Sequence, residues 1–197
     1  WRKYIPENRI YYMGAETNWW SVGENGPCGP DTEMFYDITP EGLGNLTKEE
    51  YIKADQDQKV IEIWNDVFME YEKKDGKVIR KLKQRNVDTG AGLERVAVAV
   101  QGKSNIFETD LFSPIIELIK KESKNYNERN ARIIADHIRT SIFMVSDGVV
   151  PGNKDQGYIL RRLIRRTVLQ TKKLGLENYS VDALVAAFSG IYSKTYP

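Results

Sequence analysis

The spacing of hydrophobic and polar residues changes near the middle of the chain. In the first half, Thr32–Ile38 partly alternates, and Val60–Glu72 is a run of β-branched and aromatic residues. Both patterns predict β-strands. Lys74–Lys77 holds an Asp-Gly pair, typical of tight hairpins, so Val78–Lys83 is predicted to return antiparallel to the long strand. Ser21–Pro30, with three glycines and two prolines, is predicted to be a loop.

In the second half, apolar residues recur every three or four positions, which predicts helices. The predicted helices are Leu111–Lys121, Asn130–Val145, Gly157–Leu174 and Val181–Tyr192. The apolar stripe of Gly157–Leu174 is predicted to consist of Ile159, Leu160, Leu163, Ile164 and Val168, with four arginines largely opposite. Gly90–Gly92 is predicted to end the strand region and to begin a helix over Leu93–Gln101. Lys48–Asp57 is polar, and its pattern is ambiguous.

These elements predict an α+β protein in two parts. An antiparallel sheet with helices is expected over residues 1–103, and an α-helical part over residues 104–197, with Gly102–Asn105 as the join. A chain of 197 residues is long enough for one or two domains with a buried core.

The net charge of +1 hides an uneven distribution. Residues 1–100 hold 14 basic and 18 acidic side chains, a balance of −4, whereas residues 101–197 hold 15 and 10, a balance of +5. The overall balance excludes a uniformly basic nucleic-acid-binding protein and an acidic disordered tail. Pro151–Leu176 holds seven basic residues and one acidic residue, so a local surface there is expected to attract a polyanion.

Composition limits the class further. A single cysteine, Cys28, excludes an internal disulfide and a cysteine-cluster zinc site. No apolar run is long enough for a membrane span and no signal peptide opens the chain, so we expect no membrane partner. A single cysteine fits a reduced, cytoplasmic location. Trp1 is not preceded by an initiator methionine, so we expect the chain to be a piece of a longer one.

One glycine-rich segment, Gly90–Arg95, carries candidate chemistry. Its glycines let a backbone approach a ligand closely, and the helix that follows offers free N–H groups to an anion. Arg95 could bind a phosphate with two hydrogen bonds, and Asp88 could hold an ammonium group. The alternative is a glycine turn that caps an ordinary helix, with Arg95 in a structural salt bridge.

The same hexapeptide resembles the third signature motif of the class II aminoacyl-tRNA synthetases. Further segments resemble the alanyl-tRNA synthetase family, in the family's order: Asn18–Trp20, Gly26–Asp37, Glu62–Met69, Val87–Arg95, Ile134–Arg139, Asp147–Asn153 and Gly157–Arg166. The resemblance implies part of a class II catalytic core followed by the start of a helical tRNA-recognition domain. It also implies an enzyme that activates alanine with ATP and transfers it to the 3′ end of tRNA.

The resemblance implies a role for individual residues. The alanine pocket would consist of Trp20, Asn65, Val67, Asp88 and Gly90, with Asp88 on the α-ammonium group. ATP would be bound by Glu62, Gly92 and Arg95. Glu62 and Arg95 are the expected catalytic residues, Arg95 through the γ-phosphate and Glu62 as a possible Mg²⁺ ligand. Zinc is expected only in the family's editing domain, which we expect to lie outside this chain.

The resemblance also implies that the acceptor stem of tRNA(Ala) is the partner of the second half. Its phosphates would be contacted by Arg161, Arg162, Arg165 and Arg166, although a charged helix face is often simply solvated. Asn153 matches the family asparagine that reads a G·U wobble pair. His137 is predicted to be buried and hydrogen-bonded, while Glu33 has either an active-site or a structural role.

The family's first two motifs lie before the segment that Trp1 resembles. We therefore expect the isolated chain to be inactive in adenylate formation. Two alternatives stay open: a non-catalytic module that binds acceptor-stem RNA, and one subunit of a split synthetase completed by a chain with motifs 1 and 2.

Overall fold

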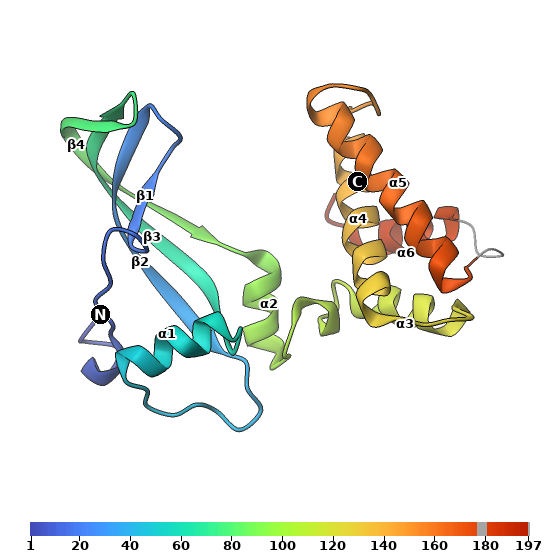
Figure 1. Ribbon diagram of the computed structural model, residues 1–197, viewed down its shortest axis with the longest axis horizontal. Coiled ribbons are helices and arrows are strands. Elements are labelled where there is room, and N and C mark those ends of the chain that lie inside the picture. The colour runs from blue at the N-terminus through green and yellow to red at the C-terminus, as the bar shows by residue number, and fades with distance from the viewer. Residues whose placement is uncertain (177–180, 197) are drawn as a thin grey trace. The chain divides into compact units, whose positions relative to one another are not determined.

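The computed structural model describes residues 1–176 and 181–196 (Figure 1). It contains an antiparallel sheet and six α-helices, which confirms the predicted α+β class. The chain divides into two compact units, Trp1–Ile106 and Phe107–Pro197. Each unit is described separately below.

The first unit is built on a four-stranded antiparallel sheet whose strands follow sequence order. The strands are β1 (Trp19–Ser21), β2 (Gly26–Asp37), β3 (Val60–Lys74) and β4 (Lys77–Ala91). The predicted hairpin is confirmed between β3 and β4. Asp75 and Gly76 have φ values of +48° and +75°, the left-handed conformations that an Asp-Gly hairpin turn requires. The returning strand continues to Ala91, well beyond the predicted Val78–Lys83.

The predicted loop over Ser21–Pro30 is wrong in its second half, because β2 already begins at Gly26. Glycine and proline predict loops from local preference alone, but here β1 and β3 pair with the segment on both sides. The register against β3 shifts between Cys28 and Asp31, and such irregularities tolerate proline. A Cβ atom on Gly29 would lie 1.9 Å from the carbonyl oxygen of Phe68, so the close approach of these strands requires glycine.

The ambiguous polar segment forms helix α1 (Lys48–Gln56). A capping box begins it: the Glu50 N–H donates to the Thr47 side chain at 3.3 Å, and the Thr47 N–H donates to the Glu50 carboxylate at 2.8 Å. Tyr51 of α1 stacks on Tyr11 and meets the edge of Phe35 of β2, with ring centroids 4.6 and 5.5 Å apart. These aromatic contacts join α1 to the sheet.

The remaining helices lie close to their predicted ranges. They are α2 (Leu93–Gln101), α3 (Ser113–Glu122), α4 (Glu128–Ser146), α5 (Asp155–Leu174) and α6 (Val181–Tyr192). Two 3₁₀ turns, η1 (Glu7–Arg9) and η2 (Ile106–Glu108), complete the elements. In the second unit α4 runs beside α5 (Figure 1). In the core of this unit, Phe112 meets the edge of Phe188 of α6, with ring centroids 6.3 Å apart.

The predicted apolar stripe of α5 is wrong at three positions, since Ile159, Ile164 and Val168 are 38–39% exposed. The buried face instead follows Leu160, Thr167, Gln170, Thr171 and Leu174. Its threonines are buried at low cost because each hydroxyl donates within the helix, for example from Thr167 to the Leu163 carbonyl at 3.0 Å. The outer face of α5 therefore combines aliphatic side chains with arginines.

Among the described residues, no helix has the length and apolar character needed to cross a membrane.

Candidate functional site

The pairing of β3 with β4 gathers four of the five residues predicted for the alanine pocket. Asn65 lies opposite Gly90, and Val67 lies opposite Asp88. Side chains two positions apart in a strand point to the same face, so both pairs lie on one face of the sheet. Trp20, the fifth residue, is half-buried on β1, which β2 separates from β3. The structure therefore brings a carboxylate, an amide and a small apolar side chain to one surface.

Two carboxylates of β2 extend this face, and the sequence analysis missed one of them. Asp31 lies opposite Val67, and Glu33 lies opposite Asn65. The Asn65 amide donates to Asp31 at 3.1 Å and to Glu33 at 3.3 Å. Asp31 is only 8% exposed, and its second oxygen is buried with no hydrogen-bond partner in the described part of the chain. An unpaired buried oxygen is costly, so this face is suited to a hydrogen-bond donor or a cation.

Burial, together with repulsion from Glu62, Asp31 and Asp55, raises the pKa of Glu33 to about 7. A carboxyl group with a raised pKa binds a proton more tightly in the folded state than in the unfolded state. Protonation of Glu33 therefore stabilises the folded state. This stabilisation is complete below pH 4.5, the ordinary pKa of the group, and is lost as the pH rises through 7.

We expect the Glu33→Gln substitution to remove this loss of stability. Relative to the unsubstituted chain, the variant should gain about 1 kcal/mol of unfolding free energy near pH 8 and almost nothing near pH 5, since water screens a half-exposed group. Urea unfolding at both pH values measures the difference. Glu41→Gln, at an exposed loop position, is the matched control. An equal effect of Glu33→Gln at both pH values would contradict the raised pKa.

Glu62 and Arg95, the two residues predicted to act on ATP, contact each other. The Arg95 guanidinium donates to the Glu62 carboxylate at 3.0 Å and to the Glu62 carbonyl oxygen at 3.1 Å. The side chains are 53% and 32% exposed, so the pair is weak enough for a ligand to displace. Gly92 precedes α2, and a Cβ atom there would lie 3.3 Å from Cδ of Arg95. The glycine thus leaves room for the arginine side chain.

The surroundings of Gly90 also leave space, because a Cβ atom there would meet nothing within 4 Å.

Within the described residues, no group of three or more His, Cys, Asp or Glu side chains is arranged around a metal position. Mg²⁺ in nucleotide sites is commonly held by one or two carboxylates and by phosphate oxygens. The single carboxylate of Glu62 fits that form of binding and does not form a metal site by itself.

The second unit presents the predicted basic surface on α5. All four predicted arginines are exposed, and they border one hollow together with Asn153 and Lys172. Arg161 donates a hydrogen bond to the side-chain oxygen of Asn153, and Arg162 lies over the ring of Tyr158 at 5.7 Å. The structure therefore places the predicted base-reading residue beside the predicted phosphate-binding residues.

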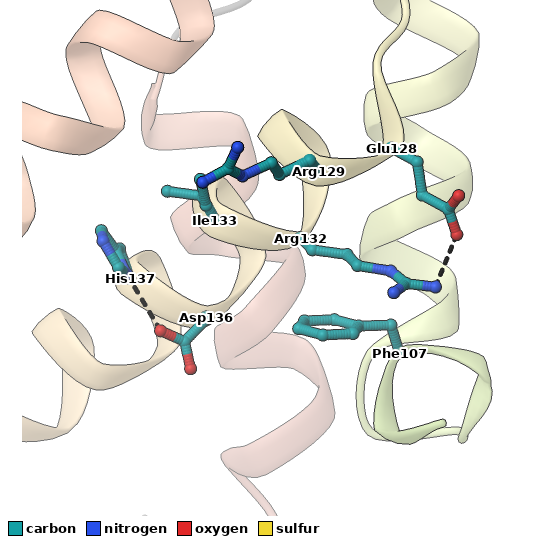
Figure 2. Close-up of a pocket in the computed structure, with 7 residues that line it drawn as sticks. All are labelled: Phe107, Glu128, Arg129, Arg132, Ile133, Asp136 and His137. Carbon is teal, nitrogen blue, oxygen red and sulfur yellow. Dashed lines mark hydrogen bonds and ion pairs between the residues drawn. The ribbon is translucent and has the colours of Figure 1, made fainter. Parts of the chain in front are cut away.

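His137 is 8% exposed, and its Nδ1 atom lies 2.9 Å from the Asp136 carboxylate, so the prediction of a buried, hydrogen-bonded histidine is confirmed. Figure 2 shows that His137 and Asp136 line a small pocket of α4 that also contains Arg132. Arg132 lies 5.2 Å above the ring of Phe107 and forms an ion pair with Glu128 at 2.5 Å. The sequence gave no signal for this pocket, because its residues come from one helix face and a distant turn.

Comparison with known proteins shows one family. A family model described as class II tRNA synthetases (A) matches residues 1–197. The alanine–tRNA ligase of Borrelia hermsii is 44% identical over 204 residues, which cover 98% of this chain and 33% of that protein. The alanine–tRNA ligases of Endomicrobium trichonymphae and Corynebacterium efficiens are 38% and 39% identical over the whole chain, which covers 23% of each. The chain thus spans between 23% and 33% of the length of these relatives.

Proposed function

This chain belongs to the class II tRNA synthetases, and from that membership we propose that it supplies the alanine pocket and part of the tRNA-binding surface of an alanine–tRNA ligase. The observation that carries the proposal is the strand register that joins Asn65 to Gly90 and Val67 to Asp88 on one face. The activity is proposed for the complete enzyme, of which these residues form one part.

In the proposed pocket, charge and size select the amino acid. Asp88 offers a carboxylate to the α-ammonium group of alanine, and the half-buried Asn65 adds polar atoms on the same face. Val67, which is 6% exposed, and Trp20 act as walls that limit the side chain to a methyl group. Walls reject larger amino acids by steric exclusion, but they discriminate poorly against glycine or serine.

The proposed reaction proceeds by positioning and charge neutralisation. A carboxylate oxygen of alanine attacks the α-phosphorus of ATP. The bond between the α-phosphorus and the oxygen that bridges it to the β-phosphorus breaks, and pyrophosphate leaves. Arg95 exchanges its bond to Glu62 for one to the γ-phosphate, which frees the Glu62 carboxylate. Mg²⁺ bound with ATP would neutralise phosphate charge, and Glu62 would hold it with the phosphate oxygens. No protein nucleophile is required.

In the second unit we propose that the basic surface of α5 binds the acceptor stem of tRNA(Ala). Arg162, Arg165 and Arg166 are exposed and carry positive charge toward solvent, which suits contacts to phosphates. Asn153, in the loop just before the same helix, would read a base pair. A cytoplasmic enzyme is consistent with this substrate and is part of the proposal.

We expect the 197-residue chain alone to give no alanine-dependent exchange of pyrophosphate into ATP. The residues that the resemblance assigns to ATP include a single arginine, Arg95, whereas charge neutralisation of three phosphates needs more cationic groups. Exchange measured with purified chain at saturating alanine and ATP tests this. A complete alanine–tRNA ligase provides the positive control, and robust exchange by the chain alone would contradict the prediction.

The two alternative functions, a non-catalytic RNA-binding module and one subunit of a split synthetase, predict different results in binding experiments. Tight binding of an acceptor-stem minihelix without any binding of alanine or ATP would favour a non-catalytic RNA-binding module. Co-purification with a second chain that carries class II motifs 1 and 2, and exchange activity of that pair, would favour a split synthetase.

A further inference from the structure

The hairpin of β3 and β4 concentrates positive charge around its turn. Residues 73–85, here called the basic hairpin, contain seven basic side chains and a single acidic one, Asp75. This leaves seven of the 14 basic and 17 of the 18 acidic side chains to the rest of residues 1–100. A positive region in an otherwise negative unit produces a local field that attracts polyanions, whatever the net charge of the chain.

The resemblance to the alanyl-tRNA synthetase family does not account for this charge. The segments that carry the resemblance stop at Met69 and resume at Val87. The basic hairpin lies between them, so the resemblance implies no role for it.

Four of the seven basic side chains have partners within the first unit. Ion pairs join Arg80, Lys81 and Arg85 to glutamates of β3. The Lys73 ammonium donates to two oxygen atoms of residues 21–23, at 3.0 and 3.2 Å. These four side chains are therefore accounted for by contacts inside the sheet.

The other three, Lys74, Lys77 and Lys83, are exposed and make no hydrogen bond or ion pair with any described residue. Lys74 and Lys77 lie directly opposite each other in the register of β3 and β4. Like charges opposite each other in an antiparallel pair destabilise the sheet. An anion bound at this pair would relieve the repulsion.

The register of the two strands is irregular around Lys83. Between the two pairs that flank Lys83, β3 has one residue, Glu70, and β4 has four, Leu82–Arg85. Strands rise about 3.3 Å per residue, so Lys77 and Lys83 lie at most about 20 Å apart along β4. A nucleic-acid duplex carries on the order of ten phosphate charges over such a length, so the lysines can contact several phosphates at once.

The turn that presents Lys74 and Lys77 is fixed to the segment before β2 (Figure 1). The Asp75 N–H donates to Oδ1 of Asn25 at 2.8 Å, and the Gly76 N–H donates to the Glu24 carbonyl oxygen at 3.1 Å. A turn whose backbone is already ordered loses less conformational freedom when it binds a partner.

Charged side chains also prevent an exposed edge strand from pairing with another chain, and β4 is such an edge. Lysines paired with glutamates would serve that purpose equally well. Protection of the edge therefore does not explain why three lysines have no partner and two of them repel each other.

We propose that Lys74, Lys77 and Lys83 form a further RNA-binding surface, located in the first unit, which contacts the sugar–phosphate backbone of the tRNA substrate without reading its bases. The lysine ammonium group is a compact point charge, which suits phosphates and carries no sequence information. The choice of RNA as the polyanion rests on the proposed function.

The test compares two triple substitutions in the same hairpin. Lys74→Gln/Lys77→Gln/Lys83→Gln removes three charges that have no partner, and Arg80→Gln/Lys81→Gln/Arg85→Gln removes three that are ion-paired. Fluorescence anisotropy of a labelled full-length tRNA(Ala) transcript with the 197-residue chain, at a series of salt concentrations, gives the affinity and its salt dependence.

For the lysine variant we expect the affinity to fall about tenfold at low salt and the slope of log affinity against log salt to fall by roughly 2 to 3. For the ion-paired control we expect a loss of less than about threefold and an unchanged slope. Urea unfolding should show the lysine variant to be no less stable than the unsubstituted chain, because the repulsion between Lys74 and Lys77 is removed. If it is less stable, Lys83→Gln against Lys81→Gln repeats the comparison outside the turn, with an expected loss of about twofold confined to Lys83→Gln.

Equal losses in the two variants, or an unchanged affinity of the lysine variant, would overturn the surface. The proposed RNA binding by α5 would stand in that case, because substitutions in α5 test it separately. If the unsubstituted chain binds no tRNA at low salt, this inference fails together with the proposed RNA binding. Polyglutamate of matched charge that displaces the tRNA as well as unlabelled tRNA does would overturn RNA as the partner.

Discussion

Replacing Gly29 with alanine should destabilise the first unit by about 3 kcal/mol or more. The new Cβ atom would lie 1.9 Å from the Phe68 carbonyl oxygen and 2.9 Å from its carbonyl carbon, and both atoms belong to the backbone. A flexible side chain could move aside, but here β2 and β3 would have to separate. The separation would disturb the register that brings Asp31 opposite Val67.

Urea unfolding followed by tryptophan fluorescence measures this effect in the first unit alone. The four tryptophans all lie in that unit: Trp1, Trp19, Trp20 and Trp64. Gly90→Ala is the matched control, because it makes the same change in the same sheet where a Cβ atom meets nothing within 4 Å. The control should change the unfolding free energy by less than about 1 kcal/mol. Similar values for both variants would show that the close approach at Gly29 is not a constraint.

Local signals in the sequence predicted the helices and the hairpin but not the whole sheet. The Asp-Gly pair and the recurrence of apolar residues are properties of short segments, and the structure confirms what they predicted. The strand from Gly26 to Pro30 depends instead on pairing with β1 and β3, which outweighs the loop preference of glycine and proline. The start of helix α1 could have been predicted from the sequence, since Thr47 and Glu50 form the Thr-x-x-Glu pattern of a capping box.

The pairing that brings the candidate-site residues together could not be predicted from local sequence signals either. The hairpin turn fixes where the pairing of β3 and β4 begins, at Lys74 opposite Lys77. Counting back from that pair without irregularities would put Gln84 opposite Val67. Two register shifts, between Met69 and Tyr71 and between Glu72 and Lys73, put Asp88 there instead. Side-chain packing sets such shifts, and a single sequence does not reveal them.

Asp31 was missed because it lies next to the segment predicted to be a loop, where a carboxylate is usually exposed. The two adjacent strands bury it and place it beside Asn65. The apolar stripe of α5 failed for a related reason: a count of hydrophobic residues does not anticipate that Thr167 and Thr171 are buried while Ile164 is exposed. In both places the environment, and not the residue type, decides exposure.

Replacing Arg162, Arg165 and Arg166 together with glutamine should weaken binding of an acceptor-stem minihelix by about 100-fold at low salt. Each lost phosphate contact should also lower the slope of log affinity against log salt by roughly 0.7–0.9. The matched control is Arg80→Gln/Lys81→Gln/Arg85→Gln on β4, which removes the same total charge. Those three side chains form ion pairs with Glu70 and Glu72 of β3, so their charge is offset locally and the control should lose less than about threefold.

Equal losses of RNA affinity in both variants would mean that the RNA responds only to net charge and that α5 is a solvated face. A loss confined to the α5 variant, with an unchanged helical circular dichroism spectrum, would identify α5 as the surface that contacts the phosphates.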